Sequence, residues 1–109
     1  MSETPLFAKF SDLLAWLTPC VTKFPKEQRF LLAGRLLDTA YACYRELVRA
    51  RKVTGAERAQ ALLCADIELE TLRLQWRLSC DLKYVSIGQY EHGARLIDEV
   101  GRMLGAWRK

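Results

Sequence analysis

The sequence predicts an all-α fold, a four-helix up-down-up-down bundle that occupies residues 1–109 as a single domain and assembles into a homo-oligomer. Apolar residues recur at steps of three and four along four stretches, which is the spacing of amphipathic helices. The turns between these stretches are short, so consecutive helices should be antiparallel neighbours. No stretch shows the alternation of apolar and polar residues that is typical of β-strands.

The first helix is expected from about Leu6 to Thr22. Thr4 and Pro5 fit an N-cap residue followed by a proline at the first helical position, where a missing backbone N–H costs nothing. Pro19 falls inside the expected span. It removes one backbone hydrogen bond, so it should kink or loosen the last turn of the helix.

The second helix is expected from about Pro25 to Arg51, because proline also suits the first turn of this helix. One apolar line along it predicts a buried face, and a second apolar line runs beside the first. The apolar stripe is therefore wide, and the helix should touch two or more neighbours. The first line consists of Phe30, Gly34, Leu37, Tyr41, Tyr44 and Val48, and the second of Leu36, Ala40, Cys43 and Leu47.

The third helix is expected from about Ala56 to Tyr84, which at 1.5 Å per residue makes it roughly 40 Å long. Thr54 and Glu57 form a capping-box pattern at its start, in which the hydroxyl accepts from the third helical N–H and the carboxylate reaches back. Its apolar residues, like those of the second helix, lie on more than one face. Stripes wider than one bundle core requires predict a homo-oligomer.

The fourth helix is expected from about Ile87 to Trp107, after a second capping-box pattern formed by Ser86 and Gln89. Three glycines lie within it, and each costs about 1 kcal/mol relative to alanine in a helix interior. Three such costs on one helix suggest that another backbone approaches closely. The glycines are Gly93, Gly101 and Gly105.

The composition predicts a cytoplasmic protein without cofactor or metal. No apolar run approaches the ~18 residues of a membrane span, and the N-terminal residues lack the apolar segment of a signal peptide. The cysteines should therefore be free thiols, each buried in an apolar helical pattern. Their wide spacing does not fit a zinc site. They are Cys20, Cys43, Cys64 and Cys80.

The residues do not support an enzyme. His92 is the single histidine, so any zinc, Ser-His-Asp or Cys-His site would have to use it. Helical ribonucleases of the HEPN type need an arginine separated by four to six residues from a histidine. Val85, Ser86 and Ile87 occupy the corresponding positions here, so this class is disfavoured.

Two adjacent acids on the fourth helix, Asp98 and Glu99, could suggest acid–base chemistry. Asp98 lies four residues before Arg102, and Glu99 lies four residues after Arg95. This is the spacing of ion pairs along one helix, so we expect these acids to have that structural role.

The second helix carries the strongest charge signal. Residues 23–52 hold eight Lys or Arg against three acids, whereas the net charge of the whole chain is +4. Several cations on one solvated face hold phosphates by Coulomb attraction, although cations near a helix C-terminus also simply complement the helix dipole. The candidate nucleic-acid-binding residues are Lys26, Arg29, Arg35, Arg45, Arg49, Arg51 and Lys52 on the second helix, Arg73 and Arg77 on the third, and Arg95 and Arg102 on the fourth.

Several runs of the sequence resemble one known family. LLAWLTPCVTKFP, FPKEQRF and QYEHGARLIDEVGRMLG are similar to the accessory variability protein, Avd, of diversity-generating retroelements. That family is akin to the four-helix proteins encoded in ribosomal-RNA intervening sequences. The resemblance covers nearly the whole chain, and none of these runs is a chemical motif, so it implies a fold and a role rather than a catalytic site.

The resemblance implies a non-enzymatic protein that binds a reverse transcriptase and RNA or DNA. It also implies a barrel-like homopentamer that supports adenine-biased, mutagenic reverse transcription, with the polymerase chemistry performed by the partner. Two alternatives stay open: a stand-alone RNA-binding bundle of the intervening-sequence type, and an enzyme of the HEPN type. A reverse-transcriptase gene beside the gene for this chain would favour the first reading.

Overall fold

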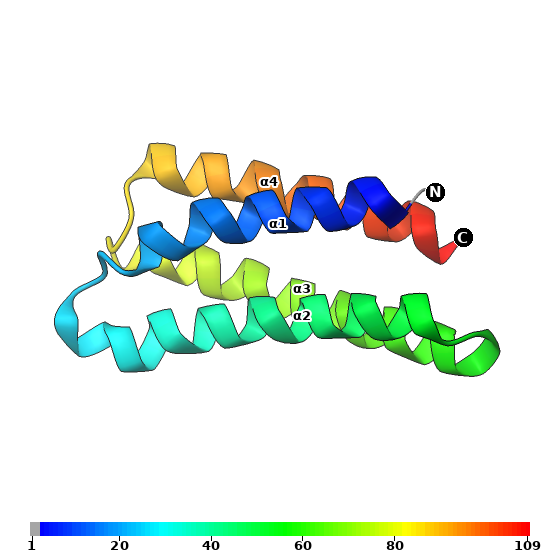
Figure 1. Ribbon diagram of the computed structural model, residues 1–109. Coiled ribbons are helices and arrows are strands. Elements are labelled where there is room, and N and C mark those ends of the chain that lie inside the picture. Colours follow the sequence, from blue (N-terminus) through cyan, green and yellow to red (C-terminus); the bar gives the residue numbers. More distant parts are fainter. Residues whose placement is uncertain (1–2) are drawn as a thin grey trace.

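The computed structural model describes residues 3–109, with side chains from Pro5 onward. Its four long helices are α1 (Glu3–Val21), α2 (Gly34–Lys52), α3 (Gly55–Asp81) and α4 (Ile87–Arg108). They run in alternating directions, with α1 and α4 forming one layer and α2 and α3 the other (Figure 1). This part of the chain contains no strand, so the predicted all-α four-helix bundle is confirmed. None of its helices has the length and apolar composition to cross a membrane.

All four helices bury apolar side chains in one shared core. Phe10 of α1, Trp76 of α3 and Ile97 of α4 are almost completely buried. Phe24, in the connection after α1, closes one end of the core against Tyr84, with ring centroids 5.4 Å apart. Burying one such side chain contributes roughly 1.5–3 kcal/mol, so the core is the main source of stability.

The first apolar line predicted for α2 is buried only in part. Phe30 is 90% exposed and Tyr41 47% exposed, whereas Leu37 and Tyr44 are half-buried against the core. The second line is fully buried.

The predicted start of the helix is also wrong, because α2 begins at Gly34 rather than Pro25. Before it, Lys26–Gln28 form a 3₁₀ turn and Arg29–Ala33 a π-helical turn. These turns differ from an α-helix in residues per turn, so Phe30 does not continue the line of residues that begins within α2.

The ends of α1 also differ from the prediction. The helix begins at Glu3, so Thr4 lies inside it and is not the N-cap. The proline that follows is tolerated because the first N–H groups of a helix have no intrahelical partner. The helix ends at Val21, two residues after Pro19, and the N–H of Phe24 then donates to the Val21 carbonyl at 3.1 Å.

The capping box at the start of α4 is confirmed, and the one at the start of α3 is wrong. The N–H of Gln89 donates to Ser86 Oγ at 3.0 Å, and the N–H of Ser86 donates to Gln89 Oε1 at 2.8 Å. Thr54 makes no side-chain capping bond. The next residue, Gly55, has φ 61°, so the chain enters α3 through a left-handed residue and the hydroxyl does not reach the helix N–H groups.

α3 ends at Asp81, three residues earlier than predicted. The chain leaves it through Lys83, whose φ is 65°, and the N–H of Tyr84 donates to the Ser79 carbonyl at 2.9 Å. This is the C-terminal motif in which glycine usually occupies the left-handed position. Because lysine stands there, the sequence contains no sign of the stop.

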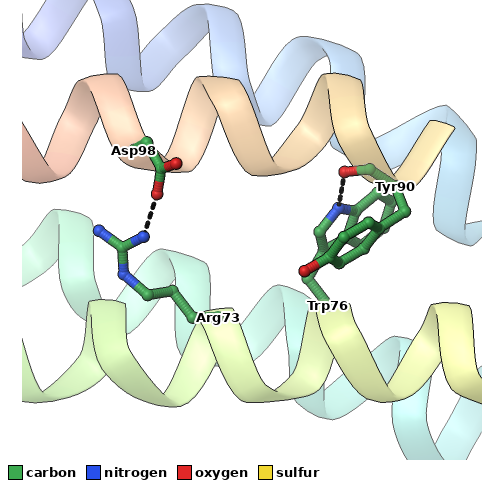
Figure 2. Close-up of polar contacts among 4 residues, drawn as sticks. All are labelled: Arg73, Trp76, Tyr90 and Asp98. Atoms are coloured by element: carbon green, nitrogen blue, oxygen red, sulfur yellow. Dashed lines mark hydrogen bonds and ion pairs between the residues drawn. The ribbon is translucent and has the colours of Figure 1, made fainter. Parts of the chain in front are cut away.

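One tryptophan joins α3 to α4 (Figure 2). Trp76 Nε1 donates to the Tyr90 carbonyl at 2.9 Å, and the two rings are nearly parallel at 6.5 Å. A Cβ at Gly93 would lie 2.6 Å from the Trp76 ring, so glycine is required there. The predicted close approach is therefore correct at Gly93, but it involves a side chain rather than a backbone. Nothing lies within 4 Å of a Cβ at Gly105.

All four cysteines are free thiols, as predicted. Cys43 is fully buried in α2, where its thiol donates to the Ala65 carbonyl of α3 at 3.3 Å. Burial first, and then the nearby carboxylates Glu68, Asp66 and Glu46, raise its pKa to about 12. The thiol therefore stays protonated throughout the neutral range.

Replacing Gly93 with alanine should lower the free energy of unfolding by about 1–3 kcal/mol, because the added methyl group would overlap the buried Trp76 ring. Gly105→Ala is the matched control in the same helix, and it should be neutral or stabilising by up to about 1 kcal/mol. Denaturant unfolding followed by circular dichroism measures both. A Gly93→Ala protein as stable as the wild type would contradict the packing.

In the folded protein at pH 8, a thiol reagent should modify Cys43 much more slowly than Cys20, Cys64 or Cys80. The thiolate is the reactive form, and the raised pKa keeps the Cys43 thiol protonated. Burial also keeps the reagent away from it. After denaturation all four should react without prior reduction. Peptide mass spectrometry resolves the sites, and fast labelling of Cys43 in the folded state would contradict the expectation.

Candidate nucleic-acid interface

The outer surface of α2 is basic mainly in its C-terminal half. Arg45, Arg49 and Lys52 recur at i, i+4 and i+7, and all three are exposed. Arg35 is exposed nearer the start of the helix. We call these four residues the α2 basic face. The negatively charged backbone of a nucleic acid lying along α2 would meet several cations in succession, as phosphate binding requires.

Arg49 is the one member of the α2 basic face for which the described structure shows an ion pair. Its Nε lies 3.1 Å from Glu46 Oε1, one turn away on the same helix. The Arg49 side chain remains 64% exposed, so this is a surface pair of little energetic weight. The guanidinium therefore stays accessible to a phosphate.

Two predicted residues lie at the other end of this region. Lys26 belongs to the 3₁₀ turn, Arg29 begins the π-helical turn, and both are exposed. With 1.5 Å per residue, Arg29 and Arg45 are roughly 24 Å apart along the chain direction. The structure therefore places these two cations away from the end of α2, near the α1–α2 connection (Figure 1).

Arg51 has a different environment from its neighbours in sequence. Its guanidinium lies over the ring of Phe7 in α1, 4.2 Å from the ring centroid. Such a cation–π contact contributes about 0.5–1 kcal/mol at an exposed site. Arg51 therefore helps to hold α2 against α1, and it is directed away from the α2 basic face.

The predicted cations of α3 and α4 form a second group on another side of the bundle. Arg73 is paired with Asp98 across the two helices (Figure 2). Arg77 is exposed beside it on α3, and Arg95 and Arg102 are exposed on α4. Because α4 belongs to the other layer from α2, the eleven candidate residues do not form one continuous surface.

The expected ion pairs within α4 are wrong. Asp98 pairs with Arg73 of α3, and Glu99 pairs with Lys9 of α1, at 3.2 Å. Both carboxylates lie on sides of α4 that face a neighbouring helix, where the partner cations are closer than those along the same helix. The two acids therefore join helices, as structural residues rather than acid–base groups.

Sequence reasoning missed a basic residue that joins α3 to the end of α4. Arg58 Nη2 donates to the Trp107 carbonyl at 2.8 Å, and its guanidinium lies 5.3 Å from the centroid of the Trp107 ring. It thus satisfies a free carbonyl at the helix C-terminus. The contact spans 49 residues of sequence, so no local pattern could have indicated it.

A groove of about 730 Å³ runs between α3 and α4. Its walls are mainly apolar or aromatic, and its charged residues carry both signs. Its apolar and aromatic lining includes Ile67, Leu74, Tyr90 and Ala94, and its charged lining residues are Glu70, Arg73, Arg77 and Asp98.

His92, the single histidine of the chain, lies on the surface. It is exposed on α4, and its ring packs against Trp16 with centroids 4.7 Å apart. Within residues 3–109, no three His, Cys, Asp or Glu side chains are grouped as metal ligands would be.

Comparisons with known proteins agree with this architecture. A family model described as bAvd-like matches residues 6–109. The fold is similar to a crystal structure from Bacteroides thetaiotaomicron, of a protein with unknown function from the S23 ribosomal protein family. The TM-score is 0.88 over 99% of this chain and 98% of that one, at 16% sequence identity, so this likeness concerns the fold alone. No curated protein matches the chain.

Proposed function

The chain belongs to the bAvd-like family, and from this premise we propose that it is a non-enzymatic accessory protein of a diversity-generating retroelement. In this role it binds the element's reverse transcriptase together with RNA or DNA, and it supports mutagenic reverse transcription. It acts as a homo-oligomer, a pentamer by the family resemblance. The observation that carries the proposal is the family match, which covers almost the entire bundle.

The charge distribution supports the nucleic-acid part of this proposal. Arg45, Arg49 and Lys52 of the α2 basic face lie about one turn apart on a rigid helix, and Arg35 lies almost three turns before Arg45. All four are exposed rather than covered by other helices. Such a surface neutralises phosphates and releases their counterions, which yields affinity without base recognition. The protein would then hold template RNA or nascent DNA near the polymerase, which alone performs the chemistry.

A second function needs only the fold and the α2 basic face. The fold matches a protein of the S23 ribosomal protein family closely along the whole chain. A stand-alone, basic RNA-binding bundle of the intervening-sequence type would have the same helices and the same basic face, without a polymerase partner. The two functions differ in whether a reverse transcriptase binds.

Co-purification with the reverse transcriptase of the same element separates these functions. Tagged chain expressed with that polymerase should retain it, with RNA bound in the complex, through washes at physiological salt. If the chain binds RNA and not the polymerase, the stand-alone function is correct. If it binds neither at low salt, both proposals fail.

Replacing Arg45, Arg49 and Lys52 with glutamine should weaken binding to all RNA sequences alike. Each lost phosphate contact removes about 0.9 from the slope of log K against log salt on a duplex and about 0.7 on a single strand, so the triple variant should flatten the slope by roughly 2–3. Fluorescence anisotropy between roughly 50 and 200 mM salt measures the effect. An unchanged affinity would show that nucleic acid binds elsewhere.

The matched control replaces Lys9, Arg58 and Arg108 with glutamine. None of them is a candidate binding residue, and all three already have partners: Glu99, the Trp107 carbonyl and Asp66 respectively. The control changes the net charge by the same amount as the test variant. Its slope should stay much closer to that of the wild type, and an equal loss would indicate a non-specific effect of net charge.

A further inference from the structure

α3 is apolar on two opposite faces. One face packs into the bundle core, with Leu62, Leu69, Leu72 and Trp76 buried. The other points away from the core, and its apolar side chains are between 40% and 58% exposed. We call this second set the α3 outer stripe; it consists of Leu63, Ile67, Leu74, Leu78 and Leu82.

The α3 outer stripe is continuous along the helix. Its members follow one another at four or seven residues, which keeps them on one side of an α-helix. Thr71 fills the position between Ile67 and Leu74, and it is uncharged. The stripe runs for roughly 29 Å along the axis. Five of the nine exposed large hydrophobic residues in the described chain belong to it, so the exposure is concentrated rather than scattered.

The neighbouring helix of the same layer shows the opposite pattern. α2 turns the charged residues of its basic face to solvent and needs no cover. A helix that is apolar on two faces is typical of one packed between two neighbours. α3 has such a neighbour on its inner side only, within the described chain. An apolar surface of this length marks a contact with another macromolecule.

The groove between α3 and α4 extends this surface sideways. Ile67 and Leu74 line the groove as well as belonging to the stripe, and Tyr90 and Ala94 form its α4 side. The charged residues of the groove cancel, since two are acidic and two basic. They are Glu70, Arg73, Arg77 and Asp98.

We propose that the α3 outer stripe, together with the adjoining groove, is the surface against which a second copy of this chain packs. The inference rests on the self-assembly included in the proposed function and names the surface that performs it. A standard interface buries about 800 Å² per partner, which is a patch roughly 32 Å across. The stripe is close to that length, and the adjoining groove adds width beside it.

Charge favours a second copy over nucleic acid at this surface. Each chain carries a net charge of +4, so two copies repel one another where their basic faces meet. The side with the stripe is where that repulsion is least, because acids and bases balance there. The stripe must also be covered as soon as the chain folds, and a second copy is always present in equal amount.

The test replaces two stripe residues without altering net charge. Ile67→Glu with Leu78→Lys puts opposite charges into the stripe, at positions exposed enough for the helix to keep its fold. Light scattering should give a multiple of 12.6 kDa for the wild type and 12.6 kDa for the variant, at equal micromolar concentration. The control, Phe30→Lys with Ile87→Glu, alters residues that are 90% and 70% exposed but outside the stripe, and should keep the wild-type mass.

A monomeric wild type, or a stripe variant that keeps the wild-type mass, overturns the inference. If circular dichroism shows that the charged variant is unfolded, Leu63→Gln with Leu74→Gln is measured in its place and should also be monomeric when folded. A variant that keeps its mass but loses the reverse transcriptase assigns the stripe to the polymerase, which also overturns the inference.

The outcomes for the proposed function are separate. A wild type that binds RNA and polymerase as a monomer supports the binding roles of the proposed function, and it rejects both the self-assembly and this inference. A wild type that assembles through the stripe but binds neither supports the inference and rejects the function.

Discussion

The contact of Trp76 with Gly93 sets the relation of α3 to α4, and the surfaces of both helices depend on it. The indole fits only because residue 93 has no side chain, and its N–H is anchored on the Tyr90 carbonyl. With α3 held in this rotation, Arg73 reaches Asp98 and Leu74 is left facing outward. One tryptophan in the core thus determines which residues appear on the surface.

The bundle separates two kinds of surface. α2 carries the α2 basic face, and α3 carries the α3 outer stripe. Within each helix, the 3.6-residue period keeps these side chains apart from those that pack into the core. A protein with this arrangement can contact nucleic acid on one side and protein on another without competition between them.

The four helices and their directions could be predicted from periodicity, and the Ser86 cap from local sequence. The start of α2 could not, because the π-helical turn before Gly34 has no sequence signature. The more deeply buried of its two apolar lines could not either, because both lines have helical spacing. The partners of Asp98 and Arg58 could not either, since both contacts join residues distant in the chain. The candidate site was predictable as a set of cations, but its division between two sides required the packing of the helices.

The π-helical turn at Arg29–Ala33 has a consequence for how such chains can diverge. It holds one residue more than an α-helical turn would. Deleting a single residue there would convert it to an ordinary turn and leave α2 and the core in place. The segment with Lys26 would then keep nearly its present direction, because a π turn completes about the same rotation with one residue more. The turn can therefore absorb the loss of one residue while the connecting segment and the bundle stay in place.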